Sequence, residues 1–158
     1  MTQPISSTAA DIERAQRLLG AGNLEDAHKL INTVLADSPE NSDGQYTFAV
    51  IQRLKKNHLE ALEILDKVLQ QQPNLARAYQ ERALNELSLN KPMRAGRALE
   101  SAVALDPSLL KSWQLLVPLY KASGSSKAGD AQQQVEFLET LPSELLTAIS
   151  FLSADRLL

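Results

Sequence analysis

Small and apolar side chains recur along this chain at helical spacing, and the whole pattern returns every 34 residues. Three prolines mark the period, at Pro39, Pro73 and Pro107. Four more series share its register: Ala15, Ala49, Ala83 and Val117; Ala27, Ala61 and Ala95; Ile31, Leu65 and Leu99; and Val34, Val68 and Ala102. A fixed period of this length is typical of stacked helical repeats, in which each unit buries its apolar side against its neighbour.

Within each repeat the spacing predicts two helices joined by a short turn. The first helix has a small residue at its middle. It ends near Gly22, Lys56, Asn90 or Gly124, of which the two glycines and the asparagine tolerate the left-handed conformation that ends many helices.

The second helix carries a small, a large and a small residue at positions i, i+4 and i+7, as in Ala27, Ile31 and Val34. The small residues allow two helix backbones to approach, and the large residue fills the space between them. The proline then stops this helix, and we expect Asn74 and Ser108 to cap the helices that follow.

These features resemble the tetratricopeptide repeat family: the period, the Ala…Leu…Ala helix and the terminal proline. The fourth repeat adds Trp113, Leu116 and Tyr120 at the spacing that this family favours in its first helix. The resemblance runs from about Thr8 to the C-terminus. It implies an all-α solenoid, a right-handed superhelix of antiparallel helix pairs. The expected organisation is an N-terminal tail (1–7), four repeats (8–41, 42–75, 76–109 and 110–142) and a last segment (143–158).

The fourth repeat departs from strict periodicity. Counting by 34 places Gly129, Gln133 and Glu136 at the Ala, Leu and Ala positions, which does not fit. A shift of two residues places Ala131, Val135 and Leu138 there instead. The stretch "SGSSKAGD" is therefore predicted to be a lengthened, mobile loop, and the connection at "ETLPSE" to be short.

The last segment, "SELLTAISFLSADRLL", is an apolar helix by pattern. Its alignment with the first repeat predicts either the first helix of a fifth, truncated repeat or a terminal capping helix. Caps usually have a polar outer face, so we favour a truncated repeat in an excised part of a longer protein. The apolar side, formed by Leu145, Ile149, Phe151 and Leu152, suggests a homodimer through this helix.

Composition narrows the range of functions. Hydrophobic residues make up 44% of the chain and aromatic residues 4%, with no cysteine. This composition favours helices and a cytoplasmic location. A formal net charge of −3 argues against nucleic-acid binding, and no apolar stretch is long enough to span a membrane.

The sequence gives no positive evidence for an enzyme. We predict no catalytic, cofactor-binding or metal site, since His28 and His58 lack obvious ligand partners and no phosphate-binding loop is present. The last helix is also similar to the middle of bacterial proteins that join tetratricopeptide repeats to a C-terminal sulfotransferase domain. That likeness implies a non-catalytic N-terminal array of such an enzyme, with the donor-binding residues outside this chain.

The first helices of stacked repeats line the concave side of a solenoid, so their outward residues are the candidate binding surface. The helical register places these side chains there: Ile12, Gln16, Leu19, Tyr46, Val50, Arg53, Arg77, Gln80, Leu84, Leu87, Lys111, Gln114 and Lys121. An apolar middle with basic residues along it suits a peptide with apolar anchors and acidic groups.

Some tetratricopeptide proteins bind acidic C-terminal peptides through a clamp of Lys, Asn and Arg side chains. At the matching positions stand Ile12, Gln16, Thr47, Arg77 and Glu81, so only Arg77 resembles that clamp. The third repeat also carries Arg82 and Glu86 where the family is usually apolar, and these could pair at i, i+4. The main expectation is a protein-interaction scaffold, with the sulfotransferase array and a self-associating structural module as alternatives.

Overall fold

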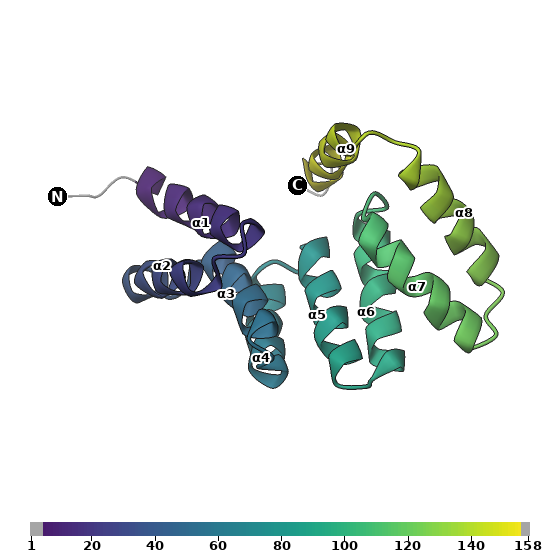
Figure 1. Cartoon of the computed structure of the whole chain (residues 1–158), viewed down its shortest axis with the longest axis horizontal. Coiled ribbons are helices and arrows are strands. Elements are labelled where there is room, and N and C mark those ends of the chain that lie inside the picture. The colour runs from purple at the N-terminus through teal and green to yellow at the C-terminus, as the bar shows by residue number, and fades with distance from the viewer. Residues whose placement is uncertain (1–4, 156–158) are drawn as a thin grey trace. The chain divides into compact units, whose positions relative to one another are not determined.

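The computed structural model describes the backbone of residues 5–155 and the side chains of residues 7–149 (Figure 1). Within residues 5–155 it contains nine helices and no strand. The helices are α1 (Ile5–Gly20), α2 (Leu24–Asp37), α3 (Ser42–Leu54), α4 (His58–Gln71), α5 (Ala76–Ser88), α6 (Pro92–Leu105), α7 (Leu110–Ala122), α8 (Ala128–Glu139) and α9 (Ser143–Asp155). The chain divides into two compact units, Met1–Pro73 and Asn74–Leu158.

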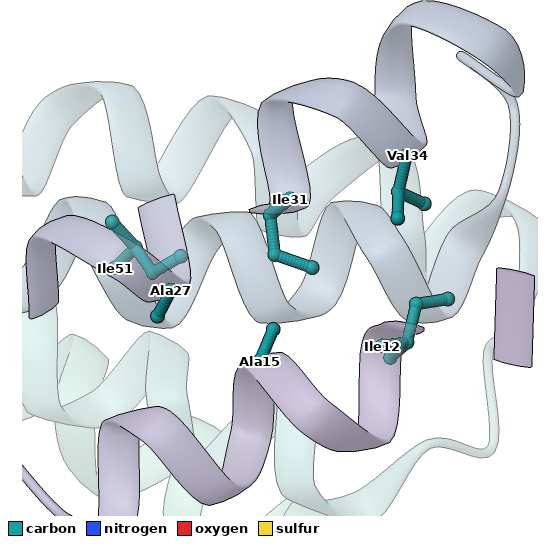
Figure 2. Packing of buried hydrophobic residues seen from close by; sticks show 6 residues of the cluster. All are labelled: Ile12, Ala15, Ala27, Ile31, Val34 and Ile51. Carbon is teal, nitrogen blue, oxygen red and sulfur yellow. The ribbon is translucent and has the colours of Figure 1, made fainter. Parts of the chain in front are cut away.

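In the first unit, α1 packs against α2, α3 packs against α4, and α3 also contacts α1 and α2. The core between α1, α2 and α3 is built from small and β-branched side chains (Figure 2). It contains Ile12, Ala15, Ala27, Ile31, Val34 and Ile51. Ala15 and Ala27 are fully buried, as the small-residue series predicts, so the two backbones approach closely and Ile31 fills the space beside them.

The second unit repeats this scheme. Helix α5 packs against α6, α6 against α7, and α7 against α8. Its core includes Ala83, Ala95, Ala98, Leu99, Val103 and Leu116, and continues into Val117, Ala131 and Val135. The predicted series is confirmed: Ala27, Ala61 and Ala95 are all fully buried, and so are Ile31, Leu65 and Leu99.

The turns inside the four helix pairs share one backbone geometry. Gly22, Lys56, Asn90 and Gly124 all have positive φ, between 57° and 82°. In each turn the next amide reaches back to close the helix end, as in Asn23 N–H to Leu18 O at 2.8 Å and Lys91 N–H to Glu86 O at 2.8 Å. This is the Schellman arrangement. The left-handed conformation is therefore adopted even at Lys56, although a residue with a long side chain is less suited to it than glycine or asparagine.

The predicted caps at Asn74 and Ser108 are wrong. The cap positions of α5 and α7 fall one residue later, at Leu75 and Leu109, whose side chains cannot accept a hydrogen bond. At the equivalent place before α3, Asn41 does cap, since its Oδ1 accepts from the Gly44 N–H at 2.8 Å. Ser108 turns inward instead, and both its Oγ and its backbone N–H donate to Asp106 Oδ1, at 2.6 and 3.0 Å.

The shifted register of α8 is confirmed. Ala131, Val135 and Leu138 are buried, whereas Gly129, Gln133 and Glu136 are exposed. The turn before α8 has five residues (123–127) where the others have three, so the lengthening is confirmed. Helix α8 nevertheless begins at Ala128, within the stretch predicted to be a loop.

The last segment forms a helix, α9, as its pattern predicts. Leu145 is 45% exposed and Ile149 is half-buried. Phe151 and Leu152 lie outside the residues whose side chains are described. Whether α9 is the first helix of a further repeat or a terminal cap stays a prediction.

Candidate functional site

The candidate site is the outward side of the first helices, here named the first-helix face. In the second unit it comprises Arg77, Gln80, Leu84 and Leu87 on α5 with Lys111, Gln114 and Lys121 on α7. In the first unit it comprises Tyr46, Val50 and Arg53 on α3. Helical spacing puts each group on one side of its helix, because residues three and four apart lie above one another.

On α5 and α7 of the second unit, two amides of the face are fixed by hydrogen bonds. Gln80 Oε1 accepts from Ser112 Oγ at 2.7 Å, which links α5 to α7. Gln114 Nε2 donates to Glu139 Oε1 at 3.1 Å, so this part of the face also includes the end of α8. Sequence reasoning considered first helices alone and therefore missed Glu139.

The cations of the second unit's face are available for a ligand. Arg77, Lys111 and Lys121 are exposed, and none has an ion pair or a side-chain hydrogen bond with a described residue. Leu84, on the same side of α5 as Arg77, is half-buried. Leu87 is half-buried as well, and it packs against the core cluster of the second unit, so much of its apolar surface is already used.

In the first unit Tyr46, Val50 and Arg53 are all half-buried on α3. The prediction that Ile12 faces outward is wrong. Its side chain is 5% exposed and belongs to the core in Figure 2, because it packs with the buried residues of α2, which include Ile31 and Val34. Gln16 is exposed and its Nε2 donates to Thr47 Oγ1 at 3.3 Å, whereas Leu19 packs on the core.

His28 joins two helix pairs by ordinary packing. Its ring stacks on Phe48 with centroids 5.7 Å apart, and Lys55 Nζ donates to His28 Nδ1 at 2.7 Å. Lys55 also pairs with Glu25 at 3.2 Å. Among the described residues, no group of three or more His, Asp or Glu side chains is arranged to hold a metal ion.

A polar brace connects α6, α7 and the turn before α8. Tyr120 Oη donates to Glu100 Oε1 at 2.8 Å, and Lys127 Nζ lies 3.3 Å from the same oxygen. Burial and the bond to Glu100 raise the pKa of Tyr120 to about 12. The bond from Tyr120, together with Lys127 and Arg97, holds the pKa of Glu100 below its usual value despite partial burial. Lys127 also lies 5.8 Å from the Tyr120 ring centroid.

Part of the chain matches a known family of repeats. Residues 18–84 match the family model described as Tetratricopeptide repeat. A search of curated protein sequences returns no match. No helix in the described part of the chain combines the length and the apolar character that crossing a membrane requires.

Solved structures of similar fold include MamA 41-end from Desulfovibrio magneticus RS-1, with 24% identity, a TM-score of 0.69, and coverage of 84% of this chain and 76% of that one. A MamA RS-1 double mutant gives 23% identity, a TM-score of 0.69, and coverage of 87% and 78%. A mutant of Thermobaculum terrenum O-GlcNAc transferase gives 18% identity and a TM-score of 0.70 over 76% of this chain, but only 23% of that chain.

These likenesses, each below 25% identity, concern the fold. They agree with the family match and with the nine helices found within residues 5–155. No sulfotransferase is among the matches described above, so that parent stays a prediction. The expected fold is confirmed: the chain is an all-α solenoid of the tetratricopeptide-repeat type.

Proposed function

We propose that this chain is a protein-interaction module that binds a partner segment on its first-helix face. The observation that carries the proposal is the set of unneutralised cations in the second unit. Arg77, Lys111 and Lys121 are exposed without partners, and the half-buried Leu84 lies on the same side of α5 as Arg77. Tetratricopeptide solenoids are suited to such a role because their repeats present an extended surface.

The chemistry of this face selects its partner. Free guanidinium and ammonium groups bind carboxylates, and the bonds are stronger than those between neutral groups. Leu84 offers an apolar contact beside them, which favours a peptide with one aliphatic or aromatic anchor and flanking acidic residues. The cations also accelerate encounter with an acidic partner at low salt. The first unit presents Tyr46, Val50 and Arg53 as its own part of the face.

A peptide-library selection tests this proposal. Peptides selected on the full chain should combine acidic residues with one apolar anchor. Arg77→Glu with Lys111→Glu should weaken a selected peptide by ~10-fold or more, equal to ~1.4 kcal/mol in binding free energy, as measured by calorimetry. Leu84→Gln should weaken it further by removing the apolar contact.

Lys67→Glu is the matched control, since Lys67 is an exposed lysine on α4, a second helix. It makes the same change of charge as either single substitution, Arg77→Glu or Lys111→Glu, with which it is compared, and should leave the affinity within ~2-fold of the unmodified chain. Equal weakening by Lys67→Glu would show that only net charge matters. Selected peptides that bind all variants alike would contradict the proposal.

Self-association is a second candidate function. Leu145 on α9 is 45% exposed and Phe137 on α8 is 57% exposed, and large exposed apolar side chains favour contact with another surface. Sedimentation at several concentrations should show a dimer that is lost on Leu145→Asp. A chain that stays monomeric at every concentration would remove this candidate. The predicted contributions of Phe151 and Leu152 can be tested in the same way.

The prediction of a non-catalytic array in a larger sulfotransferase depends on the gene. A reading frame that continues beyond the codon for Leu158 into a domain with sulfate-donor-binding residues would support it. A reading frame without such a domain would remove it, and it would leave the binding proposal unaffected.

A further inference from the structure

A polar slot lies between α5 and α6, wholly within the second unit. It has a volume of about 300 Å³ and is lined by Tyr79, Arg82 and Glu86 of α5 and by Arg94, Arg97 and Ser101 of α6. The two helices lie side by side (Figure 1). Three guanidinium groups thus line one small cavity, and a single carboxylate accompanies them.

Two of the three arginines form no salt bridge within the described residues. Arg94 and Arg97 are exposed, and their guanidinium groups have no hydrogen bond or ion pair with a described residue. Glu100 is the carboxylate whose pKa is lowered by the charge of Arg97, but its Oε1 already accepts hydrogen bonds from Tyr120 and Lys127. The slot therefore has an excess of positive charge on the α6 side.

Stability does not account for the buried carboxylate on the α5 side. Arg82 and Glu86 occupy positions where Leu116 and Tyr120 stand one period later. Glu86 is 3% exposed, and its Oε2 is buried without a hydrogen-bond partner. A buried acceptor left unsatisfied costs free energy, which an apolar side chain would avoid. Such departures from a stabilising pattern are expected where a protein binds something.

We propose that the α5–α6 slot binds an extended acidic peptide segment with two carboxylates two residues apart. The lining residues span eight positions on each helix, seven steps or ~10 Å, which is the length of three extended residues. Alternate side chains of an extended peptide lie on one side, ~6.6 Å apart, and Arg94 and Arg97 lie about one helical turn apart. Each guanidinium binds one carboxylate, and the hydroxyl groups of Tyr79 and Ser101 lie within the lining.

The slot is separate from the first-helix face. At 100° per residue, Arg82 and Glu86 lie roughly 150° around α5 from Arg77, Gln80 and Leu84. A ligand in the slot therefore does not require the first-helix face, and the inference does not rest on the proposed function.

The probe is the blocked peptide Gly-Glu-Ser-Glu-Gly, labelled with a fluorophore and titrated with the full chain at low salt. Arg94→Gln with Arg97→Gln should lower its affinity by ~10-fold or more, because both carboxylates lose their partners. Both residues are exposed, so the double variant should keep the helical circular dichroism of the unmodified chain. The peptide with Gln in place of both Glu should not bind, and the peptide with adjacent Glu residues should bind more weakly.

Arg77→Gln with Lys111→Gln removes two positive charges, as the slot variant does, but from the first-helix face, and it should leave the affinity for this probe within ~2-fold. Loss of binding in that variant alone would overturn the slot and favour the first-helix face. Displacement of the peptide by inorganic phosphate, but not by sulfate, at equal concentration would overturn the peptide assignment in favour of a phosphate ligand. A probe that does not bind the unmodified chain at low salt would also overturn it.

The first unit provides a matched slot of different charge. Between α1 and α2, Arg14, Leu18, Asp26, Lys29 and Thr33 line a cavity of about 340 Å³. They stand two periods before Arg82, Glu86, Arg94, Arg97 and Ser101. Because Asp26 replaces an arginine, this slot should not bind the probe, and Lys29→Gln should have no effect. Asp26→Arg should raise the stoichiometry from one peptide towards two.

Discussion

The third helix pair (α5 and α6) and the fourth (α7 and α8) have the same turn geometry but carry different side chains at equivalent positions of their first helices. Tyr79, Arg82 and Glu86 of α5 correspond, one period on, to Trp113, Leu116 and Tyr120 of α7. The residues of α7 hold it in place. Leu116 is fully buried, Trp113 packs on two core clusters while its Nε1 donates to Pro107 O at 2.9 Å, and Tyr120 bonds to Glu100 on α6.

At the same positions α5 carries an arginine and a buried glutamate, which line a charged slot. Both pairs nevertheless keep the Schellman turn and bury small residues at the contact between their helices, Ala83 and Ala95 in the third pair and Val117 and Ala131 in the fourth. The two pairs thus share the turn and the small buried residues, although other positions of their first helices differ in size and charge. The remaining positions of the first helix are then available for packing or for binding.

The largest expected effect is at Leu116. Leu116→Ala should lower the free energy of unfolding by ~2–5 kcal/mol, because it leaves a cavity in a fully buried part of the core. Arg82→Ala, at the equivalent position of α5, should change it by less than ~1 kcal/mol. Urea denaturation of both variants measures the difference. Equal losses would mean that Arg82 has the same packing role as Leu116.

A smaller effect of opposite sign is expected at Glu86. Glu86→Met fills the same space without a polar atom, so it should raise the free energy of unfolding by ~1 kcal/mol. The same variant tests whether the carboxylate was kept for binding rather than for folding. Urea denaturation provides the measurement, and Glu86→Gln is the control that keeps an acceptor. A clear loss of stability in Glu86→Met would show that the carboxylate has a partner that stabilises the fold.

Sequence periodicity predicted the fold because the same positions of each repeat are buried between its two helices, so they carry the same kinds of side chain. Ala27, Ile31 and Val34 recur as buried residues in the next two pairs, and the shift of two residues before α8 could be seen from Ala131 and Val135 alone. The caps could not be placed to the residue. A side chain one position away can bond elsewhere, as Ser108 does with Asp106.

The surfaces were harder to predict, because outward positions on a single helix do not reveal contacts made by another helix. Ile12 has the register of the first-helix face but lies in the core, and Gln114 meets Glu139 of α8. Arg82 and Glu86 stood out in the sequence as polar residues at apolar positions. Arg94 and Arg97 of α6 join them only when the helices are paired, so the slot could not be predicted from α5 alone.

The smallest expected effect concerns Tyr120. Its hydroxyl group bonds to Glu100 in the fourth pair, whereas Glu86 Oε2, at the equivalent position of the third pair, has no hydrogen-bond partner. Tyr120→Phe removes the hydrogen bond to Glu100 and should lower the free energy of unfolding by ~1 kcal/mol at neutral pH. Because the pKa of Tyr120 is raised to about 12 in the folded chain, its contribution is present below pH ~10 and is lost as the pH rises from there towards 12. The contribution of Glu100, whose folded pKa is lowered, is present above pH ~4.5 and is lost as the pH falls below it.

Absorbance of tyrosinate separates these contributions directly. The difference between the titrations of the unmodified chain and of Tyr120→Phe should show one tyrosine that ionises near pH 12, and a difference centred on pH ~10 would contradict the brace. Glu100→Gln should lower the pKa of Tyr120, since it removes the negative charge beside the hydroxyl. It should not return that pKa to the value of a free tyrosine, because burial of the ring is the larger cause of the shift and is unchanged. A pKa that returned fully to the value of a free tyrosine would mean that the Glu100 carboxylate alone raises it and that burial of the ring does not contribute.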